Sequence, residues 1–368
     1  VHLHNHTHFS LLDAAASPDG LIKAAVADGQ KALAITDHGV MFGCFEFYKK
    51  AKKSGIKPII GCEVYLAVRK HTDREKVQDA GKNRNYYHLV LLAKNEQGYK
   101  NLVKLTSIGH TAGYYYKPRI DMDLLRQHHE GLIATSACLA GPINAPMLAG
   151  DEATARANAI TLKEIFGDDF YIELQDHGLP EDKHVLEFAP RLARELGIKL
   201  VVSNDAHYVK KDDAIAHNVL LHINKDASFA RDGRFDVKKD LRYRVDEMYL
   251  KTQAQMKELF KDFAEGIEST EEIADKVDLT IPTELQLPKF PIPPDSDATT
   301  LEDYLEEITM KGLEERFPIL TNEILDRVGF ELNVIKRMGY AGYFLIVWDF
   351  IRAAREMGVR VGPGRGSA

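Results

Sequence analysis

Short apolar runs alternate with amphipathic helical stretches from residue 1 to about residue 225. About seven strand–helix units follow one another in this way. Such an order is typical of an α/β fold with a parallel sheet and right-handed crossovers. An open doubly wound sheet and a closed barrel both fit the count. The expected strands cover residues 1–6, 32–36, 57–66, 88–93, 131–135, 170–174 and 200–203.

Helical patterns fill the intervals between these strands. Ser17, Pro18 and Asp19 are typical of a helix start, because serine caps the first turn and proline fits the first helical position. This helix is expected to end near Ala27. Further helices are expected at residues 44–54, 96–108, 153–166, 180–196 and 213–223.

Residues 281–300 contain five prolines and show neither a helical nor a strand period. We therefore expect a linker here, between a domain at 1–280 and a second domain at 301–368. The second domain is expected to be helical, with helices at 300–316, 321–337 and 341–357. Its glycine-rich ending, VGPGRGSA, is interpreted as the point at which a larger protein continues.

Composition narrows the possible classes of protein. The net charge of −7 gives no global basic signal, so a nucleic-acid partner cannot be argued from charge alone. No run of 18 apolar residues occurs, and we expect no contact with a membrane. Three cysteines without a CxxC pair fit a reducing cytoplasm better than a disulfide framework, so a cytoplasmic location is expected.

Histidines occupy alternate positions of the opening segment, at His2, His4, His6 and His8. Because side chains alternate along a strand, His4 and His6 are expected on one face. Two imidazoles on one face form half of a metal site.

Residues of metal-ligand type also follow or lie within later predicted strands. Parallel α/β folds place their ligands at the carboxyl ends of strands. Each such residue alone is more often structural, but their joint placement predicts a common site. These residues are Asp13, His38, Glu63, His88, Cys138, Asp205 and His207.

Nine ligands exceed the four that one tetrahedral ion takes, so we expect two or three divalent ions with Glu63 as a bridge. Mixed histidine and carboxylate ligation suits zinc, manganese or iron, and the thiolate of Cys138 favours zinc. Such a site suits phosphoester hydrolysis, because one ion generates hydroxide while its neighbours stabilise the phosphate and the leaving oxygen.

Several motifs carry a family resemblance. Residues 1–280 resemble the PHP (polymerase and histidinol phosphatase) superfamily in HLHNHTHFS, ITDHG, GCE, YYHLVLLA, TSACL and SNDAH. The flanking text resembles bacterial replicative DNA polymerase III alpha subunits of the DnaE type, in GIKPIIGCEVY, NEQGYKNL, GYYYKPRID and GYFLIVWDFIRAAREMGVRVGPGRGSA. The resemblance implies a distorted seven-stranded β/α barrel, followed by a mainly helical segment that opens the polymerase palm.

The resemblance also implies a trinuclear metal centre, for which this sequence has all nine ligand positions. It assigns the third ion's ligands to catalysis. The three ligand sets that it implies are His4, His6, Glu63 and Asp205, then Glu63, His88 and Cys138, and finally Asp13, His38 and His207.

By the same resemblance, the chain is a piece of a DNA-directed DNA polymerase whose PHP domain is a metal-dependent 3′–5′ exonuclease. The palm aspartates that bind magnesium would lie downstream of this chain. The primer 3′ end and other replicase subunits, such as the sliding clamp, are the implied partners. Backbone N–H groups near the chain's end would hold nucleotide phosphates, at Gly364, Arg365, Gly366 and Ser367.

Two alternatives stay open. In the first, bound metal only stabilises a non-catalytic scaffold. In the second, the chain hydrolyses a small phosphomonoester, although the linker and the helices after it argue against this. We also expect Arg119 to bind a phosphate near the site, and residues 71–84 to form a polar loop.

Overall fold

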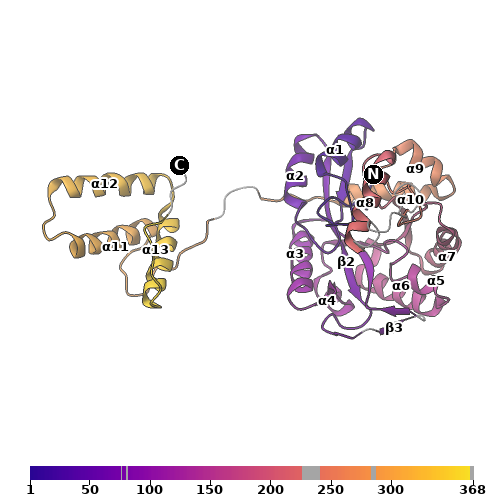
Figure 1. Cartoon of the computed structure of the whole chain (residues 1–368), viewed down its shortest axis with the longest axis horizontal. Helices are drawn as coiled ribbons and strands as arrows, with labels where there is room; N and C mark the ends of the chain where they lie inside the picture. The colour runs from indigo at the N-terminus through magenta and orange to yellow at the C-terminus, as the bar shows by residue number, and fades with distance from the viewer. Residues whose placement is uncertain (76, 80–81, 226–240, 283–286, 365–368) are drawn as a thin grey trace, which may run out of the picture. The chain divides into compact units, whose positions relative to one another are not determined.

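The computed structural model describes residues 1–75, 77–79, 82–225, 241–282 and 287–364. The chain divides into two compact units, Val1–Ile281 and Pro282–Ala368 (Figure 1). No helix in the described part of the chain combines the length and the apolar character that a bilayer crossing needs.

The larger unit is built on one curled mixed sheet flanked by helices (Figure 1). The strand order is β10-β9-β8-β5-β2-β7-β6, and β1 pairs with β2 beside this path. The strands are β1 (Ala32–Ile35), β2 (Lys57–Ala67), β5 (Tyr86–Ala93), β6 (Tyr114–Tyr115), β7 (Lys117–Ile120), β8 (Leu132–Thr135), β9 (Phe170–Leu174) and β10 (Lys199–Val202).

The opening segment joins the two edges of this sheet. His2 bridges Leu33 of β1, and Asn5 bridges Ala206 just beyond β10. The backbone N–H of His6 donates to the Ala206 carbonyl at 2.8 Å, so the contact is a true hydrogen bond. The segment predicted as a strand at 1–6 therefore forms isolated bridges instead of a ladder. The predicted α/β class with a distorted barrel is confirmed.

The prediction of a wholly parallel sheet is wrong. Strand β5 runs antiparallel to both of its neighbours, β2 and β8. The described residues between β2 and β5 contain no crossover helix. The short hairpin of β3 (Val77–Asp79) and β4 (Lys82–Arg84) lies between them, inside the predicted loop at 71–84. Without a crossover, the chain can return only in the opposite direction.

Most helices of the larger unit lie where their apolar period predicts them. The matching helices are α1 (Pro18–Ala27), α2 (Cys44–Lys53), α3 (Glu96–Thr111), α6 (Glu152–Phe166), α7 (Pro180–Leu196) and α8 (Ala214–Lys225). Four further helices were not predicted, three of them short. They are α4 (Met122–His128), α5 (Asn144–Leu148), α9 (Gln253–Leu259) and α10 (Ala264–Lys276).

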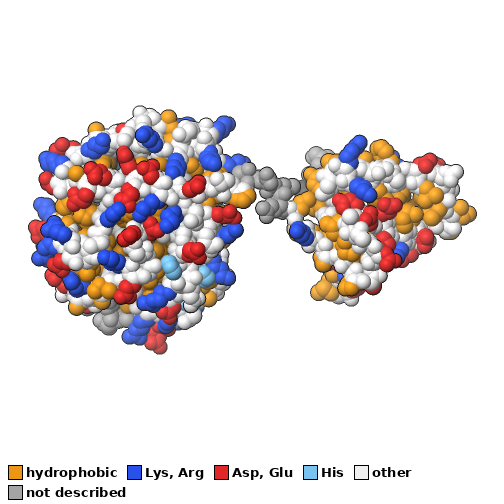
Figure 2. Space-filling model, turned by 180° about the vertical axis from the view of Figure 1, so that it is seen from behind, with side chains coloured by type: hydrophobic (Ala, Val, Ile, Leu, Met, Phe, Trp, Pro, Cys, Tyr) orange, Lys and Arg blue, Asp and Glu red, His pale blue; other side chains and the backbone are white. Residues whose placement is uncertain are grey.

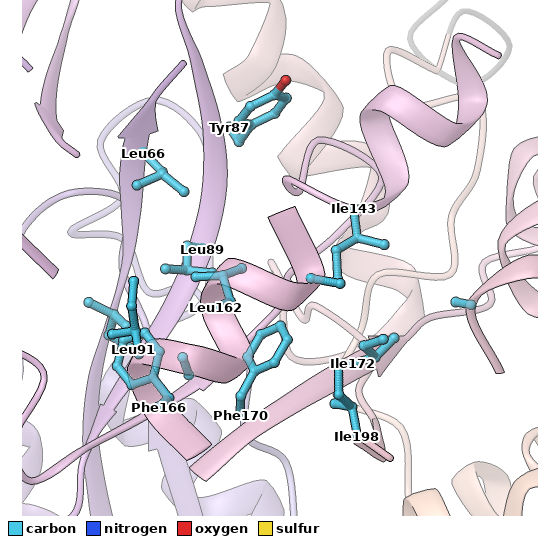
Figure 3. Packing of buried hydrophobic residues seen from close by; sticks show 14 of the residues in the cluster. Leu66, Tyr87, Leu89, Leu91, Ile143, Leu162, Phe166, Phe170, Ile172 and Ile198 are labelled. Atoms are coloured by element: carbon cyan, nitrogen blue, oxygen red, sulfur yellow. The ribbon is translucent and has the colours of Figure 1, made fainter. Parts of the chain in front are cut away.

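The core of the larger unit fills the space between the curled sheet and its helices. Figure 3 shows Leu89 and Leu91 of β5 beside Leu162 and Phe166 of α6, with Phe170 of β9 next to them. Burial of such aliphatic and aromatic side chains contributes roughly 1.5–3 kcal/mol each. This packing holds the strand ends that carry the predicted ligands.

Helix α3 begins directly against a turn that leads into β8. A Cβ atom added at Gly98 would lie 1.7 Å from the Gly131 carbonyl oxygen, so only glycine fits. We expect Gly98→Ala to lower the free energy of unfolding of the larger unit by about 3 kcal/mol. Calorimetry measures this against Gly329→Ala, whose added Cβ meets nothing within 4 Å. Equal melting temperatures for the two variants would contradict the close approach.

The smaller unit contains three helices in its described part, α11 (Leu301–Arg316), α12 (Asn322–Arg337) and α13 (Ala341–Glu356). All three helices were predicted. Several of its apolar side chains are exposed, including Phe330 at 61% and Phe350 at 57%.

Figure 2 shows acidic and basic side chains intermixed on the visible face of the larger unit, in keeping with the absence of a global basic signal.

Candidate metal centre

One rim of the curled sheet gathers all nine predicted ligands. His38 follows β1, Cys138 follows β8, and Asp205 follows β10. His88 lies near the start of β5 rather than at its end. Because β5 is antiparallel, its beginning reaches the rim where its neighbours end. The remaining ligands lie in the opening segment, in the loop before α1, within β2 and after β10.

Glu63 lies at the centre of the cluster. Its Oε2 atom is 2.7 Å from His38 Nδ1, 3.2 Å from His6 Nε2 and 3.5 Å from His4 Nε2. Its Oε1 atom is 2.9 Å from His88 Nδ1 and 3.8 Å from Cys138 Sγ. One carboxylate thus faces four imidazoles and a thiol, which is the arrangement that a bridging ligand requires.

Two further carboxylates complete the cluster. Asp205 Oδ1 lies 3.1 Å from His6 Nε2 and 3.3 Å from His4 Nε2. Asp13 Oδ2 lies 2.8 Å from His38 Nε2 and 4.0 Å from His207 Nε2. Among the described residues, three groups place their ligand atoms within 4.8 Å of one another: His6, His38 and His207; His4, His6 and Asp205; and His38, Glu63 and His88.

The donor set fits divalent cations. Glu63 Oε2 and Asp205 Oδ1 are buried and accept no hydrogen bond. Both face imidazole nitrogens, so several lone pairs converge on the same small space. Buried anionic oxygens without donors are costly unless a cation compensates them. Nitrogen, oxygen and sulfur ligands together match zinc-like ions.

Electrostatics keeps His207 and Glu63 in metal-binding forms but not His4 and His38. Burial lowers the pKa of His4 and His38, but nearby carboxylates outweigh it and raise both, so these two rings hold a proton that a metal ion would displace. Burial is the largest effect on His207 and lowers its pKa to about 3, which keeps the ring neutral. Burial raises the pKa of Glu63, but His88, His38 and His4 outweigh it and hold this pKa well below the usual range. Burial, with the nearby Glu63 and Asp205 carboxylates, raises the pKa of Cys138. A metal bound there would therefore displace a proton from the thiol.

Strained backbone conformations occur at one ligand and directly before two others. Asp205 has a φ of 45°, in the left-handed region that non-glycine residues rarely adopt. Ala137, directly before Cys138, has a φ of 57°, and Leu12, directly before Asp13, has a φ of 58°. Such strain persists where the surrounding structure enforces it, and it is concentrated at functional sites.

The loop that carries Asp13 is pinned by Asp37. The Asp37 carboxylate accepts hydrogen bonds from the Thr7 backbone N–H at 2.7 Å and from the Ser10 hydroxyl at 2.8 Å. Ser10 Oγ also lies 3.1 Å from His6 Nδ1. The polar residues between His6 and Asp13 thus fix the turn that brings these two ligands to one rim.

Sequence reasoning missed several polar partners of the ligands. Glu173 Oε1 lies 2.7 Å from His4 Nδ1, and the Tyr243 hydroxyl donates to Asp13 Oδ1 at 2.8 Å. A glutamate inside the apolar strand FYIEL was a usable signal, because a buried charge needs a partner. Tyr243 gave no such signal, since it lies 230 residues from Asp13 in the chain.

The sequence predicted two phosphate-binding elements, Arg119 and residues 364–367. Arg119 is buried, and its guanidinium donates to the backbone carbonyls of Gly113, His71 and Asp73. The expectation that it binds a phosphate near the site is therefore wrong. Of the predicted nucleotide-phosphate residues, Gly364 is described, with a φ of 86°. Arg365, Gly366 and Ser367 lie outside the described residues.

A cavity of about 390 Å³ opens beside the ligands. Six predicted ligands line this cavity, so part of the metal cluster faces the open space. The other lining residues supply apolar, phenol, amide, imidazole and guanidinium groups. They are Leu139, Ala140, Gln175, His177, Leu179, Arg242, Tyr243, Arg244, Val245 and Met248.

Comparisons with known proteins cover both units. A family model described as the PHP domain matches residues 2–177, and one described as the bacterial DNA polymerase III alpha NTPase domain matches residues 303–368. The DNA polymerase III subunit alpha of Borreliella burgdorferi is 46% identical over 370 residues, covering 100% of this chain and 31% of the relative. That of Treponema pallidum is 44% identical over 369 residues, with the same coverage.

The chain thus spans about a third of the length of these curated relatives. Among solved structures, an amidohydrolase from Chromobacterium violaceum is similar, with a TM-score of 0.38 and 16% identity. That match covers 57% of this chain and 88% of the solved one.

Proposed function

Because the chain belongs to the bacterial DNA polymerase III alpha subunits and carries a PHP domain, we propose that its rim cluster is a metal-dependent 3′–5′ exonuclease centre. The observation that carries this proposal is the Glu63 carboxylate, which faces four imidazoles and one thiol beside an open cavity. The reaction would be hydrolysis of the terminal phosphodiester of a DNA strand.

Two or three divalent ions would be held by the nine rim residues. When bound, such ions lower the pKa of a water molecule and stabilise charge on phosphate and leaving oxygens. Zinc, manganese and iron all accept these ligands, and Cys138 favours zinc. Three ligand sets are proposed: His4, His6, Glu63 and Asp205; Glu63, His88 and Cys138; and Asp13, His38 and His207. The residues of the last set are also proposed to be catalytic.

The residues that line the cavity beside the ligands suit a nucleotide. Apolar side chains such as Leu139, Leu179 and Met248 offer a surface for a base. Arg242 and Arg244 line the same cavity, and guanidinium groups bind phosphate oxygens through paired N–H donors. Tyr243 holds Asp13 in place through its hydroxyl. These residues would orient the strand end while the rim holds the metal.

The test is digestion of a primer with a mismatched 3′ end, in manganese or zinc. We expect Asp205→Asn to slow digestion by at least about 100-fold, since a carboxylate of the cluster loses its charge. Asp262→Asn, at an exposed position away from the rim, serves as the matched control. Equal digestion by wild type and Asp205→Asn would exclude nuclease chemistry at this centre.

A metal-stabilised scaffold is the second candidate. The opening segment joins the sheet edges through isolated bridges and single hydrogen bonds rather than a strand ladder, so metal ions would strengthen the link there. This reading predicts a higher melting temperature with metal but no digestion of DNA or of a small aryl phosphate in any metal. Turnover of the aryl phosphate far above that of DNA would instead favour a small-molecule phosphatase.

We further propose that the complete protein carries out DNA-templated DNA synthesis during replication in the cytoplasm. Its partners would be the primer 3′ end and replicase subunits such as the sliding clamp, with magnesium bound by residues beyond this chain. Residues 364–367 would contribute to binding the phosphates of an incoming nucleotide. Similarity of the whole chain to DNA polymerase III subunit alpha supports this proposal.

A further inference from the structure

Glu173 of β9 is a buried carboxylate that contacts the metal cluster through a single ligand. Its Oε1 atom lies 2.7 Å from His4 Nδ1, and both side chains are 1% exposed. The other ring nitrogen of His4, Nε2, faces Glu63 and Asp205 at 3.5 and 3.3 Å. The His4 imidazole therefore lies between Glu173 of β9 and the metal cluster, with Nδ1 directed to the former and Nε2 to the latter.

The hydrogen bonds of Glu173 distinguish it from the ligands. Its Oε1 atom also accepts from the Gln175 amide at 2.8 Å and from the Ser203 hydroxyl, and its Oε2 atom accepts from the Thr135 hydroxyl. Glu63 Oε2 and Asp205 Oδ1, in contrast, accept no hydrogen bond. Four protein groups thus contact the Glu173 carboxylate, three of them at Oε1, and it lies beside His4 rather than facing several ligand nitrogens as Glu63 and Asp205 do.

These donors also fix the position of the carboxylate. Thr135 ends β8, Ser203 follows β10, and Glu173 itself lies between them in β9. The Glu173 backbone N–H donates to Ser136 Oγ at 2.9 Å, which ties β9 to the same rim. Three neighbouring strands of the sheet therefore set the direction in which the carboxylate presents its lone pairs.

We propose that Glu173 is a positioning residue that holds His4 with its proton on Nδ1 and its Nε2 lone pair directed at a metal ion. A carboxylate that accepts from the far nitrogen of a ligating histidine fixes the ring's tautomer and orientation and strengthens the ligand. This inference rests on the proposed metal centre, because His4 has a ligand's role only there.

The variant Glu173→Gln keeps the shape of the side chain and removes its charge. We expect the affinity for one zinc ion to fall 10- to 100-fold, as for other outer partners of metal ligands, while the remaining zinc stays bound. Equilibrium dialysis of the full chain against zinc buffers, with metal analysis, measures this. In the cobalt-loaded protein, the visible absorption bands of one site should shift, which a purely structural role would not cause.

Glu272→Gln is the matched control. Glu272 is also held by several donors, Tyr171, Lys199 and Lys276, but it touches none of the proposed ligands. Its variant should keep wild-type zinc binding and cobalt spectrum. Thr135→Val, which removes one donor to Glu173 and keeps the carboxylate, should weaken the same ion a few-fold and covers the case in which Glu173→Gln fails to fold.

The outcomes separate the two proposals. Wild-type protein that binds no zinc would overturn the metal centre itself. Wild-type protein that binds zinc, together with unchanged zinc affinity and cobalt spectrum in Glu173→Gln and Thr135→Val, would overturn the positioning role alone. Equal loss of zinc in Glu173→Gln and Glu272→Gln would assign the effect to general stability and would also overturn it.

Discussion

Replacement of Glu63 by glutamine is expected to remove both ions that this residue is proposed to bridge and to lower the proposed exonuclease activity by at least about 100-fold. The carboxylate faces His4, His6, His38 and His88, so its charge has more ligand neighbours than any other group of the rim. An amide has nearly the same shape but cannot bridge two cations. Metal analysis after dialysis and primer digestion measure the two effects.

Glu258→Gln, at a side chain that is 77% exposed, is the control for Glu63→Gln. It should retain the metal content and the activity of the wild type. Retention of both ions by Glu63→Gln would contradict the bridging role and would leave the ligand sets to be assigned differently. Retention of the ions with loss of digestion would move Glu63 from ligand to a role in the hydrolytic step.

The sequence predicted the rim cluster well because each ligand is tied to a local feature. His38, Cys138 and Asp205 each follow an apolar strand pattern, so their place at one rim follows from the α/β architecture alone. His4 and His6 face the same carboxylates although their segment forms only isolated bridges. The comparisons confirm the family resemblance that these motifs carry.

The direction of strand β5 and the contacts between residues far apart in the chain were harder to predict. The apolar pattern of a strand does not depend on its direction, so the pattern of β5 gave no sign that this strand is antiparallel. The available signal was the lack of a predicted helix between β2 and β5. Tyr243 approaches Asp13 from a loop far along the chain, and no local pattern encodes such a contact. The guanidinium of Arg119 is enclosed by carbonyls whose positions depend on the turns around it.

Removal of metal is expected to destabilise the protein far more at pH 8.5 than at pH 6. Burial lowers the pKa of His38, but the Glu63 and Asp13 carboxylates outweigh it and raise this pKa to about 10 in the metal-free fold. A histidine whose pKa rises on folding stabilises the fold fully below its unfolded pKa of about 6.5, and that stabilisation is lost as the pH rises toward 10. The metal-free protein should therefore lose about 2–3 kcal/mol from His38 between pH 6.5 and 8.5.

Bound metal changes the sign of this dependence. Ions require deprotonated ligands, so metal binding strengthens as the pH rises. The difference in melting temperature between metal-loaded and chelated protein should thus widen steadily from pH 6 to pH 8.5. Calorimetry at constant ionic strength measures it, and His38→Gln is the comparison, because its chelated form should lose most of the decline above pH 6.5. A gap that narrows with rising pH would contradict a cation held among Glu63, Asp13 and His38, since protons and cations could not then be competing for the same lone pairs.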